Sequence, residues 1–186
     1  MTRLEAALLE MTALLDELHL DYMLIGGLAV GQWGEPRATL DVDLTMWVEP
    51  EQFESTVRML AARLALRTSQ PLEFARKNRL LPVRASNGVQ VDLLFAVWPL
   101  EKQAIETAVE RRIHGARVRV AGLDYLLFLK LISDRPQDLA DAAALLRRHR
   151  GKVNLDWLER ELSELAEAIA EPDMLRRFER LRIASA

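Results

Sequence analysis

The chain has 186 residues, of which half are hydrophobic and 28% are charged, and its formal net charge is −3. A chain of this length can bury roughly 70% of its unfolded surface, so we expect a globular protein of one domain, or one domain with a helical appendage. It contains no cysteine, which excludes disulfide bonds and thiolate metal sites and suits a reducing cytoplasm. The small negative charge argues against nonspecific coating of nucleic acid, but not against a local basic site.

The first part of the chain alternates helical and strand patterns. Apolar residues recur at helical spacing from Leu4 to Leu18 with acidic residues among them, which predicts an amphipathic helix rather than a signal peptide. Residues 22–25 form a short apolar run, which predicts a buried strand that stops at Gly26 and Gly27. The next segment, "LAVGQW", has room for a short helix.

Residues 41–48 alternate strictly between polar and apolar side chains, which predicts a half-buried strand. One face of this strand is apolar. The other face begins with Asp41 and Asp43, whose side chains lie roughly 6.5–7 Å apart along the strand. Two like charges on a partly desolvated face repel each other, and a bound cation would turn that repulsion into attraction.

The middle of the chain mixes both kinds of element. We expect a helix at 50–66 with proline in its first turn, a hairpin of strands 72–77 and 79–85, a strand at 88–97, a helix at 100–111 and a strand at 117–120. The strand at 88–97 places Gln90, Asp92 and Leu94 on one face. If it pairs beside the strand at 41–48, Asp92 brings a third carboxylate to the same face.

From Gly122 onward the patterns are helical, over 123–133, 136–149, 154–170 and 172–182. We therefore expect a core at 1–121 and a helical C-terminal subdomain at 122–186. The predicted fold class is α/β (α+β), a mixed β-sheet flanked by helices with a helical C-terminal part. No stretch approaches ~18 uncharged apolar residues, so we expect no membrane span.

The glycine pair and the three carboxylates together indicate phosphate chemistry. Gly26 and Gly27 stand at a strand-to-helix turn, where backbone N–H groups and the helix N-terminus favour an anion such as phosphate. Asp41, Asp43 and Asp92 supply the oxygen ligands that Mg²⁺ or Mn²⁺ prefers, and such an ion binds substrate phosphates as well.

These residues carry a resemblance to a known family. "IGGLAVGQWGEPRATLDVDL" resembles the opening motif of the polymerase-beta-type nucleotidyltransferase superfamily, and "VQVDLLF" is similar to the strand that carries the third carboxylate there. Within this superfamily, "LDYLLFLKLISDRPQDLADAAALL" resembles the helical segment of small AbiEii/AbiGii-type toxin-like nucleotidyltransferases. The resemblance extends from about Leu24 to Leu146. It implies a nucleotidyltransferase-like fold and transfer of a nucleotide from an NTP such as ATP.

The resemblance also implies roles for individual residues. Gly26 and Gly27 would hold the triphosphate, although the family often has serine where Gly27 stands. Asp41 and Asp43 would bind the metal ion, and Asp92 would be a third ligand or the base that takes the acceptor's proton. The resemblance further implies that Arg37 and Thr39 help to bind the nucleotide. They would either shape the loop or reach a phosphate.

Lys130 lies in the segment that resembles the toxin-like enzymes, and the resemblance makes it a phosphate contact and catalytic residue. The alternative is that its stem lies on an apolar face and its ammonium group reaches water. Asp138 and Asp141 match the family's acidic helix, and Asp138 is either a helix cap or a partner of Lys130. A run of arginines at 147–150 is either a solvated helix end or, with Arg84 and the arginines of 111–119, part of an RNA-facing basic patch.

Three functional hypotheses follow from these residues and the resemblance. The first is a nucleotidyltransferase acting on a hydroxyl of RNA (tRNA) or protein, as the toxin of a toxin–antitoxin pair with a small antitoxin protein. The second is the same chemistry on a small molecule such as an antibiotic. The third is an inactive relative that only binds nucleotide, against which the three carboxylates argue. We favour a macromolecular acceptor, since the sequence shows no pocket for a small one.

Overall fold

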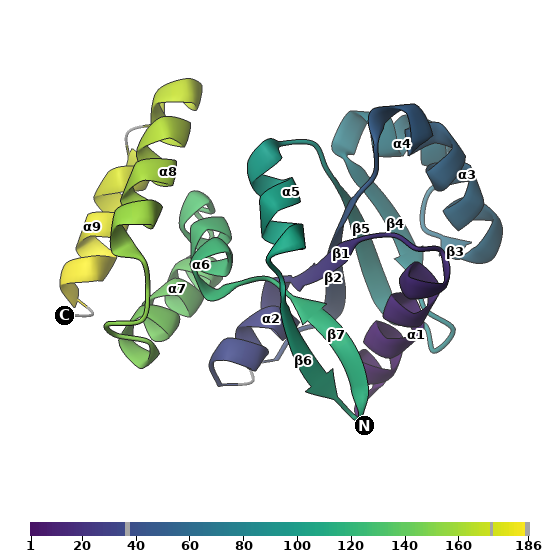
Figure 1. The fold of residues 1–186 in the computed structure, drawn as a ribbon, viewed down its shortest axis with the longest axis horizontal. Helices are drawn as coiled ribbons and strands as arrows, with labels where there is room; N and C mark the ends of the chain where they lie inside the picture. The colour runs from purple at the N-terminus through teal and green to yellow at the C-terminus, as the bar shows by residue number, and fades with distance from the viewer. Residues whose placement is uncertain (36–37, 172, 185–186) are drawn as a thin grey trace. The chain divides into compact units, whose positions relative to one another are not determined.

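The computed structural model describes residues 1–35, 38–171 and 173–184. The chain divides into two compact units, Met1–Gln32 with Pro36–Ala121, and Trp33–Glu35 with Gly122–Ala186. The first unit holds the sheet and the second is helical (Figure 1). The structure therefore confirms the predicted α/β (α+β) class, a mixed sheet flanked by helices with a helical C-terminal part.

A mixed sheet of seven strands forms the centre of the first unit, as far as the described residues show. The strands are β1 (Tyr22–Ile25), β2 (Asp41–Trp47), β3 (Ala65–Leu66), β4 (Leu80–Arg84), β5 (Gln90–Ala96), β6 (Val109–Ile113) and β7 (Ala116–Val120). They lie in the order β3-β4-β5-β2-β1-β7-β6. The pairs β2–β5 and β1–β7 are parallel, and the other neighbours are antiparallel.

Helices cover both faces of this sheet. They are α1 (Arg3–Glu17), α2 (Gly26–Trp33), α3 (Phe53–Arg63) after the 3-10 turn η1 (Pro50–Gln52), α4 (Pro71–Asn78) and α5 (Pro99–Glu106). Tyr22 pairs with Met46 across β1 and β2, and its hydroxyl group interacts with Thr12, so α1 lies on the face of Met46. Lys102 of α5 lies 4.6 Å from the ring centroid of Trp47, so α5 lies on the opposite face.

The alternation in β2 divides its side chains between these two faces. Val42, Leu44 and Met46 are fully buried on the face of α1, where they form part of the core. Asp41 and Asp43 point to the face of Trp47 and are half-buried. The apolar side of the strand holds the sheet against α1, which leaves the acidic side for another role.

The segment at 71–78 forms a helix and not the first strand of the predicted hairpin. Proline in the first turn, Glu73 near the N-terminus, and Arg76 and Lys77 near the C-terminus all favour a helix. The helix ends at Arg79 in the left-handed conformation, with a φ of 56°. The strand that follows, β4, pairs instead with β3 and β5.

The segment at 100–111 is not the single helix that the sequence predicts. It contains α5 from its second residue to Glu106, and then the beginning of β6. β6 and β7 form a hairpin around His114 and Gly115, whose φ angles are 47° and 87°. Two successive positive φ angles are typical of the turns that join such hairpins, so the tight turn favours strands here.

The second unit packs four helices within its described residues, α6 (Leu123–Ile132), α7 (Pro136–Arg148), α8 (Leu155–Ile169) and α9 (Asp173–Ala184). Its core side chains include Leu126, Leu131, Leu145, Leu162 and Phe178, each at most 1% exposed. Residues 33–35 join this unit, since His149 Nε2 lies 2.5 Å from the carbonyl oxygen of Trp33. None of the described helices is both long and apolar enough to cross a membrane.

Candidate active site

The three predicted carboxylates lie on one face of the sheet. β2 and β5 are parallel neighbours, and their register places Asp43 opposite Asp92 and Asp41 opposite Gln90. Directly paired residues on neighbouring strands point to the same face, and so do residues two apart on one strand. All three aspartates are half-buried. The prediction that the two strands are neighbours is confirmed.

The backbone of Gly26 lies against the carboxylate of Asp43. β1 pairs with β2 so that Ile25 is opposite Asp43, which brings the start of α2 to the same place. Gly26 has a φ of +68°, and a Cβ atom there would lie 1.9 Å from Asp43 Oδ2. Glycine suits this position, because a Cβ atom would force the Asp43 carboxylate to move and the positive φ itself disfavours other residues.

Thr39 and Arg67 each donate a hydrogen bond to one of the carboxylates. Thr39 Oγ1 donates a hydrogen bond to Asp41 Oδ1 at 3.0 Å, so this threonine orients the first aspartate. Arg67 Nη1 donates to Asp92 Oδ1 at 2.8 Å. The sequence does not indicate Arg67, because a single arginine after a predicted helix carries no signal. Arg67 reaches Asp92 because the two-residue strand β3 ends directly before it.

The other predicted nucleotide-binding residues of this segment are Gly27 and Arg37. Gly27 is buried in the first turn of α2. Its backbone N–H belongs to the helix N-terminus, where the groups without an intrahelical partner favour anions. Arg37 lies outside the described residues.

The donor set on this face suits a divalent cation with a preference for oxygen ligands. Asp41, Asp43 and Asp92 are all carboxylates, the ligand type that Mg²⁺ and Mn²⁺ take. Among the described residues, however, no three acidic or histidine side chains are gathered closely enough to form a metal site. Asp92 is directed toward Arg67. The three residues therefore suit a divalent cation by their carboxylate groups and by their shared face of the sheet. In this structure the described side chains are not gathered around one position.

Lys130 belongs to the second unit and makes a buried cluster of ion pairs. Its Nζ atom lies 2.5 Å from Asp138 Oδ1 and 3.1 Å from Asp141 Oδ2. The three side chains are 6%, 4% and 4% exposed. Ser133 Oγ and Arg135 Nε donate to the other oxygen of Asp138. The ammonium group of Lys130 is therefore buried, and Asp138 is its partner. A contact between Lys130 and a phosphate group stays a prediction.

This cluster makes the stability of the protein depend on pH. Burial by itself raises the pKa of Asp138, but hydrogen bonds from Lys130 and Ser133 and the nearby positive charges outweigh it, so the pKa lies below its ordinary value. Such a carboxylate stabilises the fold above its unfolded pKa of about 3.9, and the contribution disappears as the pH falls through the folded value. We expect the free energy of unfolding to fall below about pH 4, and to fall less steeply in Asp138→Asn, as measured by urea unfolding.

A second acidic group, Glu5, also has a lowered pKa and sets the baseline for this comparison. The pKa of Glu5 is lowered to about 2 by the backbone N–H of Thr2 and by His114. Glu5 is present in both the parent and Asp138→Asn, so its contribution cancels in the difference. Equal pH slopes in the two proteins would show that Asp138 is not the group responsible.

Comparison with known sequences gives no match, either to a protein-family model or to a curated protein. Solved structures do match. A nucleotidyltransferase-like protein from Paracoccidioides brasiliensis has a TM-score of 0.58 at 18% identity, over 95% of this chain and 92% of that one. The antibiotic-resistance factor ANT(2'')-Ia has a TM-score of 0.56 at 16% identity, over 89% and 94%. The lincosamide antibiotic adenylyltransferase LnuA has a TM-score of 0.51 at 13% identity, over 77% and 96%.

The chain has a nucleotidyltransferase-like fold. At these identities the likeness concerns the fold alone, so the roles of the aspartates rest on their geometry. That geometry places Asp43 and Asp92 side by side next to the N-terminus of α2. The part of the prediction that names the toxin-like subfamily has no support among these structures.

The arginines that were considered as one basic patch lie on different parts of the fold. Arg84 is on β4, whereas the arginines at 111, 112, 117 and 119 are on β6 and β7. Three strands separate β4 from β7 in the sheet. Arg84 therefore lies two strands from β2, the strand of Asp41 and Asp43, and the other four lie near the opposite edge of the sheet.

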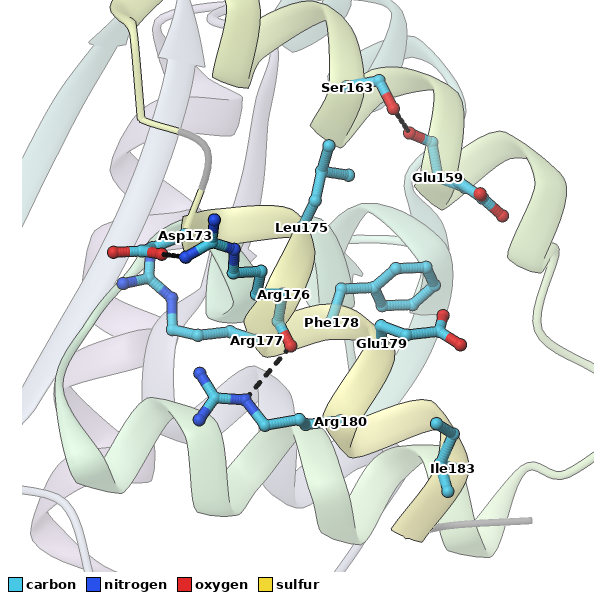
Figure 2. Close-up of a pocket in the computed structure, with 10 residues that line it drawn as sticks. All are labelled: Glu159, Ser163, Asp173, Leu175, Arg176, Arg177, Phe178, Glu179, Arg180 and Ile183. Carbon is cyan, nitrogen blue, oxygen red and sulfur yellow. Dashed lines mark hydrogen bonds and ion pairs between the residues drawn. The ribbon is translucent and has the colours of Figure 1, made fainter.

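A different pocket lies along α8 and α9 in the second unit (Figure 2). Its charged side chains are mostly bound to their own helix. Arg176 Nη1 lies 3.0 Å from Asp173 Oδ1, and Arg180 Nε donates to the carbonyl oxygen of Arg176. Leu175, Phe178 and Ile183 supply apolar lining. Ser163 Oγ donates to the carbonyl oxygen of Glu159, and Glu179 pairs with Arg182, so these groups are also held by their own helices. This pocket is therefore a poor candidate for catalysis.

Proposed function

We propose that this protein is a Mg²⁺-dependent nucleotidyltransferase, which moves a nucleoside monophosphate from an NTP to a hydroxyl group of an acceptor. The observation that carries this proposal is the in-register pair of Asp43 and Asp92, with the backbone of Gly26 packed against Asp43. The nucleotidyltransferase-like fold supports it. An inactive nucleotide-binding relative is less well supported, because all three carboxylates are present on one face.

The site residues of the first unit then have separate parts in the reaction. The N–H groups of Gly26 and Gly27 bind the triphosphate at the N-terminus of α2. Asp41, oriented by Thr39, and Asp43 would hold the cation, with Asp92 as a third ligand or as the base. When bound, Mg²⁺ supplies positive charge that offsets the negative charge developing during transfer.

The transfer replaces one phosphorus–oxygen bond with another. The acceptor's hydroxyl oxygen bonds to the α-phosphorus, while the bond from the α-phosphorus to the bridging oxygen breaks and pyrophosphate leaves. Asp92 takes the hydroxyl proton as general base. Its Oδ1 is already held by Arg67, which fixes the orientation of the carboxylate.

Two kinds of acceptor are candidates. A hydroxyl of RNA, such as a tRNA, or of a protein would fit the resemblance to toxin-like enzymes, whose partner would be a small antitoxin. A small-molecule acceptor is the second candidate, because two of the similar structures are described as an antibiotic-resistance factor and a lincomycin-bound adenylyltransferase. A transfer assay with tRNA and with an antibiotic panel separates the two.

Replacing Asp43 with asparagine tests the proposal. With α-labelled NTPs and Mg²⁺, the parent should label one acceptor class, and Asp43→Asn should lower the turnover on the order of 10²–10³-fold, the range for loss of one charge-stabilising group. Calorimetry should also show weaker Mn²⁺ binding, because a neutral amide oxygen is a poorer ligand.

Asp21→Asn is the matched control for this loss of a carboxylate. Asp21 belongs to the same unit, its side chain is 71% exposed, and it pairs with Arg119 at 2.8 Å. This variant should keep the parental rate and the parental Mn²⁺ affinity. Parental turnover in Asp43→Asn would contradict the assigned site.

A further inference from the structure

A polar pocket lies beside the carboxylates in the first unit. It is lined by Leu66, Arg67, Thr68, Ser69, Arg84 and Gln90. The lining provides two guanidinium groups, two hydroxyl groups and one amide, and it includes no acidic side chain. Such a pocket attracts anions, and arginine in particular matches the geometry of phosphate.

The pocket opens on the same face of the sheet as the carboxylates. Gln90 pairs with Asp41 on one side and with Arg84 on the other, so the three side chains share a face. Gln90 also precedes Asp92 by two residues on β5, a distance of roughly 6.5–7 Å along a strand.

Arg67 connects the pocket with the proposed base. It lines the pocket, and its Nη1 atom lies 2.8 Å from Asp92 Oδ1. A group bound in this pocket is therefore next to the carboxylate that would take the acceptor's proton. The second guanidinium group, that of Arg84, makes one long hydrogen bond of 3.5 Å to the carbonyl oxygen of Gly88. Its side chain is exposed and has donors available for a ligand.

We propose that this pocket binds a phosphate group of an RNA acceptor, so that the terminal ribose hydroxyl of the RNA lies at Asp92. This proposal rests on the proposed function and names its acceptor. The hydroxyl and the phosphate of a terminal nucleotide are separated by one sugar. The general base Asp92 and the phosphate pocket are likewise separated by one side chain, that of Arg67.

The chemistry of the lining favours RNA over the other acceptors. Arginine, serine, threonine and glutamine are typical contacts to phosphate and sugar. An aminoglycoside carries several ammonium groups, which the guanidinium group of Arg84 would repel. An unmodified hydroxyl of a protein has no neighbouring phosphate and would leave the guanidinium group of Arg84 without a ligand.

RNA binding by Arg84→Gln tests the proposal without nucleotide or metal. The probe is a short, 5′-fluorescent single-stranded RNA with a free 3′ hydroxyl, and anisotropy measures its Kd over a series of salt concentrations. The variant should bind about tenfold more weakly, as expected for a lost hydrogen bond to a charged group. The slope of log K against log salt should shrink by about 0.7, the value for one phosphate contact on a single strand.

Arg117→Gln is the control. Its side chain is 71% exposed and pairs loosely with Glu110 at 3.8 Å, on β7, near the opposite edge of the sheet. It should bind RNA as the parent does. Equal weakening in both variants, or none in Arg84→Gln, would overturn the proposal. So would tighter binding of a phosphoserine peptide than of RNA.

The transfer assay distinguishes failure of this proposal from failure of the proposed function. If labelled nucleotide is transferred to an aminoglycoside and Arg84→Gln leaves its KM unchanged, the function stands and the RNA pocket is wrong. If RNA binding depends on Arg84 but no NTP is transferred to any acceptor, the pocket stands and the proposed function is wrong.

Discussion

Gly26→Ala is expected to remove the transfer activity and to destabilise the first unit. The added Cβ would lie 1.9 Å from Asp43 Oδ2, so the carboxylate would have to move away from its place beside Asp92. The φ of +68° also costs an alanine about 1–2 kcal/mol relative to glycine. Urea unfolding measures the stability, and transfer from labelled NTP measures the activity.

Gly115→Ala separates the cost of a positive φ from the cost of the close contact with Asp43. Gly115 has a φ of +87°, and a Cβ atom there would meet nothing within 4 Å. It therefore carries the backbone cost alone and should keep full activity. The loss of stability in Gly26→Ala should exceed that in Gly115→Ala. If the two variants lose the same stability and both remain active, the close approach of Gly26 to Asp43 has no functional consequence.

Lys130→Met is expected to destabilise the protein by about 3–5 kcal/mol, the cost of removing one partner from a buried ion pair. The sequence alone predicts a retained fold, because methionine keeps an apolar stem. The structure adds a cost to this substitution, since Asp138 and Asp141 would be left buried without their common cation. Thermal and urea unfolding measure the change, which should be visible without any nucleotide.

A triple variant is the control for this interpretation. Lys130→Met combined with Asp138→Asn and Asp141→Asn removes all three charges together, and it should recover much of the lost stability. Nucleotide affinity of the refolded triple variant then tests the predicted phosphate contact. Stability of Lys130→Met equal to that of the parent would show that the cluster is not a buried ion network.

The sequence by itself determined the elements whose signals are local. Strict alternation identified β2 and its acidic face, and the glycine pair identified the end of β1, because periodicity and turn residues act over a few neighbours. Local signals failed at 71–78 and at 109–113. There a short segment suited either a helix or a strand, and the neighbouring strand or the tight turn decided between them.

Only the tertiary structure decided which distant residues meet. The register of β2 and β5 places Asp43 opposite Asp92, and the short strand β3 brings Arg67 to the same carboxylate. The positions of Asp138 and Asp141 on one side of a helix can be read from their spacing. Their burial around Lys130 cannot, because it depends on how the helices of the second unit pack, and packing joins residues between which the sequence carries no local pattern.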